Sequence, residues 1–69
     1  FFQTSFNYVN FGIEKTTQSN FKGAIIDFTK AIELDPLYAE AYFQRGYAKN
    51  KIKDYKGAIN DFNKAIELD

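Results

Sequence analysis

The sequence predicts an all-α fold made of two stacked antiparallel helix-turn-helix hairpins. Three observations lead to this prediction. A long segment of the chain occurs twice, apolar residues recur at helical spacing in both copies, and capping residues and a proline mark the helix ends. A segment that recurs at a fixed period is the signature of a repeat architecture, in which each unit needs a neighbour to bury its apolar face.

The repeated segment reads KGAIIDFTKAIELD at residues 22–35 and KGAINDFNKAIELD at residues 56–69, an offset of 34 residues. The same offset aligns Tyr8 with Tyr42 and Lys15 with Lys49. The sequence therefore predicts one domain over residues 1–69. Repeat one covers about 5–38, and repeat two covers about 39–69 and is truncated at its end.

The second helix of each repeat is predicted to be amphipathic. Its apolar stripe consists of Phe21, Ala24, Ile25, Phe28, Ala31 and Ile32 in repeat one, and of Tyr55, Ala58, Ile59, Phe62, Ala65 and Ile66 in repeat two. Asn20 and Asp54 can cap the two helix starts. Pro36 prevents the helix of repeat one from continuing past Asp35.

The first helix of repeat one, predicted at about Thr4–Thr17, has two apolar faces. One face holds Tyr8 and Phe11 together with Gly12, and the nearly opposite face holds Phe6, Val9 and Ile13. Glycine inside a helix costs about 1 kcal/mol relative to alanine. We therefore expect Gly12, and its counterpart Gly46, to let the second helix of the same repeat come close.

Composition excludes several classes of function. The 69 residues contain no Cys, His or Met, and nine basic residues balance nine acidic ones. These counts argue against disulfides, thiolate metal sites, histidine catalysis and a surface dedicated to nucleic acid. No apolar run is long enough to span a membrane. The lack of Met predicts that the chain is a fragment, and the lack of Cys is compatible with a cytoplasmic location.

The carboxylates do not suggest an enzyme. Asp27 and Asp61 are equivalent by the repeat, and so are Glu33 and Glu67. We expect all four on an ordinary charged outer face, because repetition does not create a paired acid and base. The carboxylates at the helix ends lie only two residues apart, so no dedicated metal site and no cofactor are predicted.

The repeat resembles the tetratricopeptide repeat, whose 34-residue pattern is W-x2-L-G-x2-Y, then A-x3-F, then P. The matching residues are Tyr8, Phe11, Gly12, Ala24, Phe28 and Pro36 in repeat one, and Tyr42, Gly46, Ala58 and Phe62 in repeat two. The resemblance implies a right-handed solenoid. Lys15, Arg45 and Lys49 depart from the pattern, so we expect a more solvated face there and looser stacking of the repeats.

The resemblance also implies a non-catalytic protein-interaction module, in which the first helices line a concave groove that binds a partner peptide. The expected groove residues are Phe6, Val9, Asn10, Ile13, Glu40, Phe43, Gln44 and Tyr47. Packing inside the domain is the alternative for the apolar members. Glu40 would repel a carboxylate, which disfavours the acidic chaperone tails that one subtype of the family binds.

A structural role is the competing hypothesis. Ile59, Phe62 and Ile66 would leave an apolar surface on the last helix. A continuation of the chain could cover this surface, or a second copy could do so and form a homo-oligomer. A third possibility, RNA binding through Lys49, Lys51, Lys53 and Lys56, is disfavoured because Asp54 interrupts the cluster and the chain is neutral.

Overall fold

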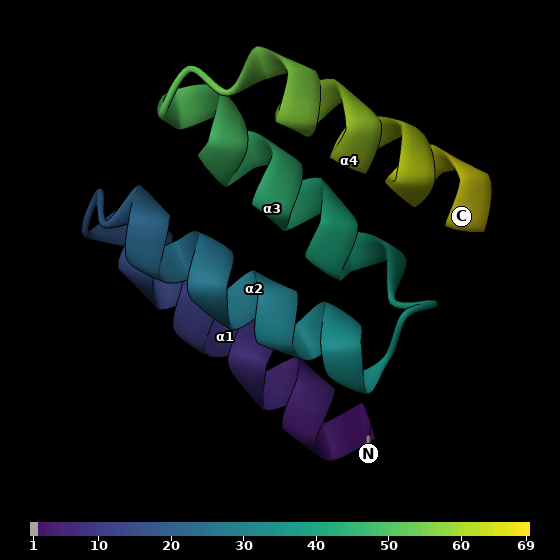
Figure 1. Ribbon diagram of the computed structural model, residues 1–69. Helices are drawn as coiled ribbons and strands as arrows, with labels where there is room; N and C mark the ends of the chain where they lie inside the picture. Colours follow the sequence, from purple (N-terminus) through teal and green to yellow (C-terminus); the bar gives the residue numbers. More distant parts are fainter. Residues whose placement is uncertain (1) are drawn as a thin grey trace.

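Four helices make up the protein in a computed structural model, which describes the backbone of residues 2–69 and the side chains of residues 4–69. They are α1 (Phe2–Thr17), α2 (Phe21–Leu34), α3 (Ala39–Lys51) and α4 (Tyr55–Leu68) (Figure 1). The helices pack pairwise as hairpins, so the predicted all-α class is confirmed. The second helix of repeat one ends at Leu34, just before Asp35 and Pro36, as the sequence predicts.

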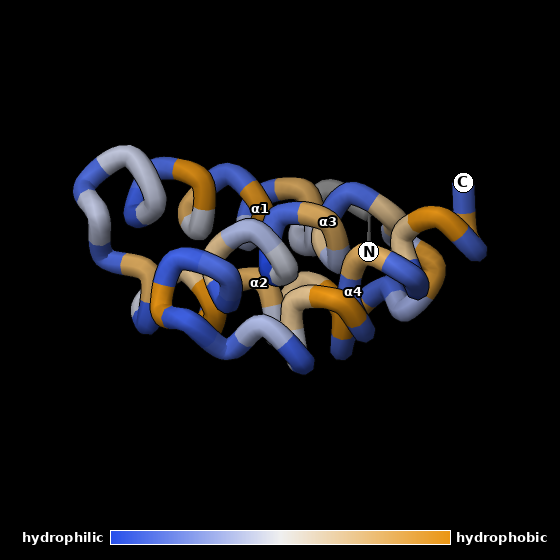
Figure 2. The backbone as a smooth tube through the Cα atoms, turned by 90° about the horizontal axis from the view of Figure 1, so that it is seen from above, coloured by the Kyte–Doolittle hydropathy of each residue, from blue (hydrophilic) through white to orange (hydrophobic). Residues whose placement is uncertain are grey.

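The four helices form two layers. Seen from above, α1 and α3 lie in one layer and α2 and α4 lie in the other (Figure 2). The closest pairs are α1 with α2 and α3 with α4, and α3 also packs against α2 and touches α1. Each predicted repeat is therefore one hairpin, and α3 joins the second hairpin to the first.

Both hairpin turns are tightly hydrogen-bonded. In the first turn, Asn20 N donates to Lys15 O over 2.8 Å and Ser19 N donates to Thr16 O over 2.9 Å, which closes the end of α1. Asn20 Oδ1 then accepts from Gly23 N over 3.1 Å and caps α2. The same residue thus ends one helix and starts the next.

The second turn repeats this geometry with Asp54, whose Oδ1 accepts from Gly57 N over 3.0 Å. Both predicted caps are confirmed. The sequence patterns did not predict that Ser19 and Lys53 adopt left-handed backbone conformations, with φ of 60° and 68°. Glycine usually takes this position after a helix end, so the sequence offered no signal for it here.

Gly12 and Gly46 allow close packing within each hairpin, as predicted. A methyl group added at Gly12 would overlap the ring of Phe28. One added at Gly46 would lie 2.8 Å from Phe62 Cε1 and 3.2 Å from Ala58 O. Each hairpin therefore places a phenylalanine of its second helix directly against a glycine of its first.

The hydrophobic core lies where the two hairpins meet. Its buried members are Val9, Ala24, Phe28, Ala31, Ala41 and Ala48, with Tyr8, Ile13, Phe21, Ile25, Ile32 and Tyr38 packed around them. The core receives two alanines from α3 and the partly buried Tyr38 from the N-cap of that helix. Small side chains on α3 therefore let the second hairpin come close to the first.

Candidate binding pocket between α3 and α4

A pocket of about 650 Å³ opens between the start of α3 and the end of α4. We call it the end pocket, and its lining residues are Ala39, Glu40, Phe43 and Gln44 from α3, with Phe62, Ala65, Ile66 and Asp69 from α4 and its C-terminal cap. The rings of Phe43 and Phe62 contact each other, with centroids 5.6 Å apart. These two rings and the aliphatic residues make the lining mostly apolar.

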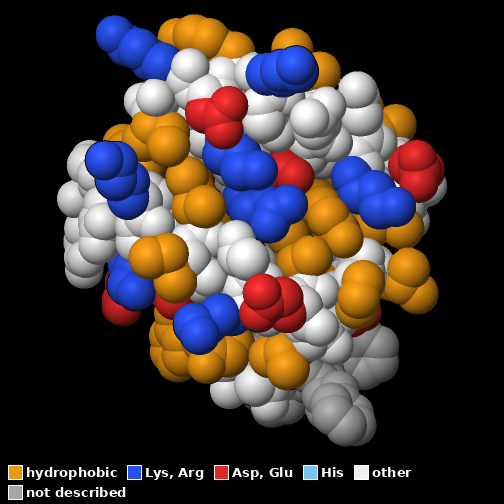
Figure 3. Space-filling model, in the orientation of Figure 1, with side chains coloured by type: hydrophobic (Ala, Val, Ile, Leu, Met, Phe, Trp, Pro, Cys, Tyr) orange, Lys and Arg blue, Asp and Glu red, His pale blue; other side chains and the backbone are white. Residues whose placement is uncertain are grey.

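The concave shape, rather than exposure alone, distinguishes this site. Hydrophobic side chains are scattered over the surface among charges of both signs (Figure 3). Ile26 and Tyr55, for example, are more than half exposed but lie outside the end pocket. The end pocket differs from these separate residues because α3 and α4 both contribute apolar side chains to one open depression.

Two carboxylates give the lining of the end pocket a negative charge. Glu40 and Asp69 are the charged residues among those that line it. At the neighbouring start of α3, burial and then the carboxylates of Glu40 and Asp35 raise the pKa of Tyr38. The lining of the end pocket is therefore mostly apolar and carries two acidic residues.

The structure brings together three of the predicted groove residues: Glu40, Phe43 and Gln44 all line the end pocket. Tyr47 is exposed on α3 outside the lining, with Lys51 Nζ 5.3 Å from the centre of its ring. Only part of the predicted groove on α3 therefore belongs to the concave site.

The predicted groove residues of α1 do not line this site. Phe6 and Asn10 are exposed on α1. Val9 is 2% exposed and belongs to the core, and Ile13 is half-buried against the core. For Val9 and Ile13, packing inside the domain was the open alternative, and their burial agrees with it. The cause is α3, which covers that side of repeat one.

Two of the three predicted self-association residues, Phe62 and Ile66, line the same pocket, whereas Ile59 is exposed outside it. The lining of the end pocket thus combines residues predicted for two different roles with Ala39, Ala65 and Asp69, which were predicted for neither. The 34-residue offset could have found them. Their counterparts Ser5, Ala31 and Asp35 lie in repeat one, where buried Ser5 and Ala31 mark the surface that the next hairpin covers.

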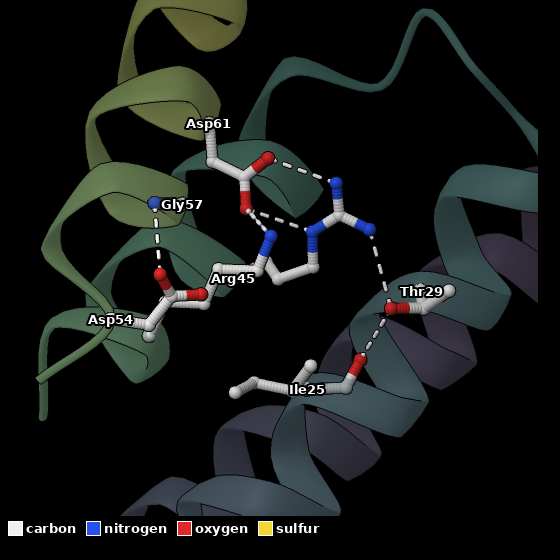
Figure 4. Close-up of polar contacts among 7 residues, drawn as sticks. Ile25, Thr29, Arg45, Asp54, Gly57 and Asp61 are labelled. Carbon is white, nitrogen blue, oxygen red and sulfur yellow. Dashed lines mark hydrogen bonds and ion pairs between the residues drawn. The ribbon is translucent and has the colours of Figure 1, made fainter. Parts of the chain in front are cut away.

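Next to the end pocket, a polar network links both hairpins. Arg45 donates from Nε to Asp61 Oδ2 over 2.8 Å and from Nη2 to Asp61 Oδ1 over 2.9 Å. Its third nitrogen, Nη1, donates to Thr29 Oγ1 on α2 over 3.2 Å, and Thr29 donates in turn to Ile25 O (Figure 4). Lys49 Nζ adds an ion pair to Asp61 Oδ2 at 3.0 Å.

This network corrects two expectations from the sequence. Asp27 and Asp61 do not lie on a solvated outer face, because they are only 6% and 4% exposed. Arg45 and Lys49 do not loosen the stacking by solvating their helix face. They are partly buried, and Arg45 joins α3 to both α4 and α2.

Repeat one contains a simpler version of this network, in which Lys15 Nζ lies 2.8 Å from Asp27 Oδ2. The lysine on the first helix and the aspartate on the second thus recur together in both repeats. This joint recurrence was visible in the sequence and could have predicted a buried ion pair. Phe11 stands where repeat two has Arg45, so the arginine link occurs in repeat two.

The network shifts the pKa of both partners. Burial alone would raise the pKa of Asp61, but hydrogen bonds from Arg45 and then Lys49 outweigh it and lower the pKa below its usual range. The hydrogen bond to Asp61 raises the pKa of Arg45. Asp61 therefore stays ionised in the folded state at pH values where an unfolded aspartate begins to take up a proton.

Stability should consequently fall in acid through Asp61. Because its folded pKa is lowered, its stabilising contribution is complete above the unfolded value of about 4 and is lost as the pH falls through the folded value. We expect Asp61→Asn to flatten the dependence of the unfolding free energy on pH between about pH 6 and pH 2, measured by urea titration with circular dichroism. Asp54→Asn is the matched control, since asparagine caps α2 equally well at Asn20. An equal slope in Asp61→Asn and Asp54→Asn would contradict the prediction.

Two further kinds of feature, a metal site and a membrane-spanning helix, are not seen among the described residues. Within residues 4–69, no group of three or more carboxylates is placed to hold a metal ion. Among the described helices, none has both the length and the apolar character that crossing a membrane requires. The end pocket is lined by apolar side chains, the amide of Gln44 and two carboxylates.

The fold and the end pocket define a helical-hairpin repeat protein with a concave apolar site. In comparisons with known proteins, residues 39–69 match the family model of the tetratricopeptide repeat. The chain is thus similar to this family over its second hairpin, and the four-helix arrangement is consistent with such repeats. A search of curated proteins found no match. Tetratricopeptide repeats generally mediate protein–protein interactions and are typically non-catalytic.

Proposed function

We propose that this chain is a non-catalytic protein-interaction module that holds a segment of a partner protein in the end pocket. The observation that carries the proposal is the concave apolar surface formed by Phe43, Phe62 and Ile66. Phe43 is 52% exposed and Ile66 is 75% exposed, so a partner that covers them removes apolar area from water. Aromatic residues in a concave site are typical binding hot spots.

The remaining residues that line the end pocket would orient the bound segment. Gln44 is half-buried and carries an amide that can both donate to and accept from a peptide backbone. Glu40 and Asp69 favour positive charge on the bound segment. The proposal therefore keeps the α3 part of the groove expected from the sequence and adds the facing residues of α4. Phe6, Asn10 and Tyr47 would take part only if a bound segment extended beyond the end pocket.

A peptide selection tests this function with an internal control. Phe43 and Phe11 are both 52% exposed, but only Phe43 lines the end pocket. We expect displayed peptides that are enriched on the unmodified chain to bind Phe11→Glu normally and to bind Phe43→Glu at least about tenfold more weakly, because a buried charge opposes an apolar ligand. Affinities would be measured by biolayer interferometry, and circular dichroism would confirm that both variants fold.

Two outcomes would contradict the proposed function. In one, the selection enriches no peptide that binds the folded chain. In the other, the enriched peptides bind Phe43→Glu as tightly as they bind Phe11→Glu, which would place binding outside the end pocket.

A further inference from the structure

The two hairpin turns share one backbone geometry but differ in surface chemistry. The first turn reads TQSN at residues 17–20, and the second reads KIKD at residues 51–54. Ser19 and Lys53 both adopt left-handed backbone conformations, and the last residue of each turn caps the helix that follows. Repeat one thus shows that this turn forms without lysine or isoleucine. The turn geometry therefore does not explain the two lysines and the isoleucine of the second turn.

The lysines of the second turn are available to a partner. Lys51, Lys53 and Lys56 are exposed. Within residues 4–69, the ion pairs to carboxylates are made by other cations, which are Lys15, Arg45, Lys49 and Lys64. The neighbouring carboxylate, Asp54, accepts from Gly57 N over 3.0 Å to cap α4. Three exposed lysines therefore surround one carboxylate that is already hydrogen-bonded.

Charge is separated along the molecule, although the net charge is zero. Both hairpin turns lie at one end, whereas the end of α2, the start of α3 and the end of α4 lie at the other (Figure 1). We call the first end, residues 17–22 and 51–56, the turn end. It holds four lysines and one carboxylate, whereas residues 33–40 and 67–69 at the opposite end hold five carboxylates and neither lysine nor arginine. This charge distribution directs the turn end toward an anionic surface.

Exposed apolar groups accompany the lysines of the turn end. Ile52 is 39% exposed between Lys51 and Lys53, and Tyr55 is 55% exposed at the start of α4. The counterpart of Ile52 in the first turn is Gln18, so the isoleucine, like the two lysines beside it, occurs in the second turn alone. Lysine and tyrosine both suit the headgroup region of a bilayer, because each joins an apolar body to a polar end. An isoleucine among them can reach the boundary between headgroups and acyl chains.

The shape of the turn end favours a flat partner. The end pocket takes its lining from residues within 39–44 and 62–69 and from no residue of the turn end. The turns instead project beyond the helices that they connect (Figure 1). Peptides and small anions bind best in concave sites, and single-stranded nucleic acid binds in grooves with aromatic platforms. A bilayer presents a flat array of phosphate and carboxylate groups, which a projecting end can meet with several lysines at once.

We propose that the turn end docks on the surface of a bilayer that contains anionic phospholipids. The lysines contact the headgroups, and Ile52 enters the boundary between the headgroups and the acyl chains. The docking is weak and reversible, since it uses a few lysines and one aliphatic side chain rather than a lipid anchor. Because the end pocket lies at the opposite end, it stays open to a partner protein while the chain is docked. The inference thus adds a second surface to the proposed function and does not depend on it.

Vesicle sedimentation tests the docking, with vesicles of phosphatidylcholine alone or with phosphatidylserine as about a third of the lipid. We expect the chain to bind the phosphatidylserine vesicles at least about tenfold more tightly than the neutral vesicles. Added salt should weaken this binding, because it screens the attraction between the lysines and the headgroups.

Repeat one supplies a variant that keeps the fold. Lys51→Thr, Ile52→Gln and Lys53→Ser together give the second turn the corresponding residues of the first, so the circular dichroism spectrum should not change. Lys30→Thr with Lys64→Ser is the control, since it removes the same charge from α2 and α4 outside the turn end. We expect the turn variant to bind phosphatidylserine vesicles at least about fivefold more weakly than the control.

A fluorescent reporter tests whether the second turn enters the bilayer. The chain contains no tryptophan, so Ile52→Trp places a single one between the two lysines. When phosphatidylserine vesicles are added, we expect its emission to shift to shorter wavelength and brominated phospholipids to quench it.

Equal binding to the two kinds of vesicle, or equal binding by the turn variant and the control, would overturn the inference. An emission of Ile52→Trp that the vesicles leave unchanged would do the same, because the turn would then stay outside the bilayer. If a single-stranded RNA oligonucleotide binds more tightly than the vesicles and loses this affinity in the turn variant, nucleic acid is the partner and the bilayer is not. Peptide binding through Phe43 tests the proposed function separately.

Discussion

Replacing Phe28 by alanine should cost much more stability than the same change at Phe62, although the two residues are equivalent by the repeat. Phe28 is fully buried under α3, and emptying such a site costs about 3–5 kcal/mol. Phe62 packs on Gly46 in the same way but lines the open end pocket. Its ring is already partly solvated, so we expect a loss of roughly 1–2 kcal/mol.

Urea unfolding followed by circular dichroism measures both values. A domain of this size has a total stability on the order of 5 kcal/mol, so Phe28→Ala could unfold the chain completely. Phe28→Leu and Phe62→Leu form a milder pair that keeps the comparison measurable. Equal losses of stability at the two positions would contradict the prediction, because burial under α3 would then add nothing to the contribution of Phe28.

Removing Arg45 should produce the second large effect. Arg45→Met keeps most of the side-chain volume but deletes two hydrogen bonds to Asp61 and one to Thr29. Asp61 would remain buried with Lys49 as its charged partner. Hydrogen bonds to charged groups contribute about 1.5–3 kcal/mol, and we expect a loss of roughly 2–3 kcal/mol.

The control for Arg45 is another ion pair of this chain. Lys64 Nζ lies 3.1 Å from Glu67 Oε1, but both side chains are substantially exposed. Exposed pairs contribute less than about 1 kcal/mol, so Lys64→Met should change the urea midpoint little. If Arg45→Met were no more destabilising than Lys64→Met, the network would not hold the hairpins together.

The sequence predicted the fold well because its signals are local. Helical periodicity, the caps Asn20 and Asp54, Pro36 and the glycines each act within one hairpin, and the structure agrees with all of them. Each of these features depends on residues close in the sequence or within one repeat, so no knowledge of the stacking was needed.

The site was harder to predict because it depends on which surfaces the stacking covers. Val9 and Phe43 are equivalent by the repeat and are both apolar, yet one is buried and the other lines the end pocket. Asp61 looked like a surface residue because its partner Arg45 lies sixteen positions away on another helix. Helical periodicity within one segment cannot detect such a pair.

The junction between the two hairpins is built from different side chains than the contacts within each hairpin. Within each hairpin, a phenylalanine ring packs against a glycine. Between the hairpins, α3 contributes the methyl groups of Ala41 and Ala48 and the side chain of Arg45. Fewer residues approach each other across the junction than within either hairpin, so we expect the hairpins to separate before either of them unfolds. A force applied to the two ends of the chain should therefore part the hairpins first and leave each helix pair intact.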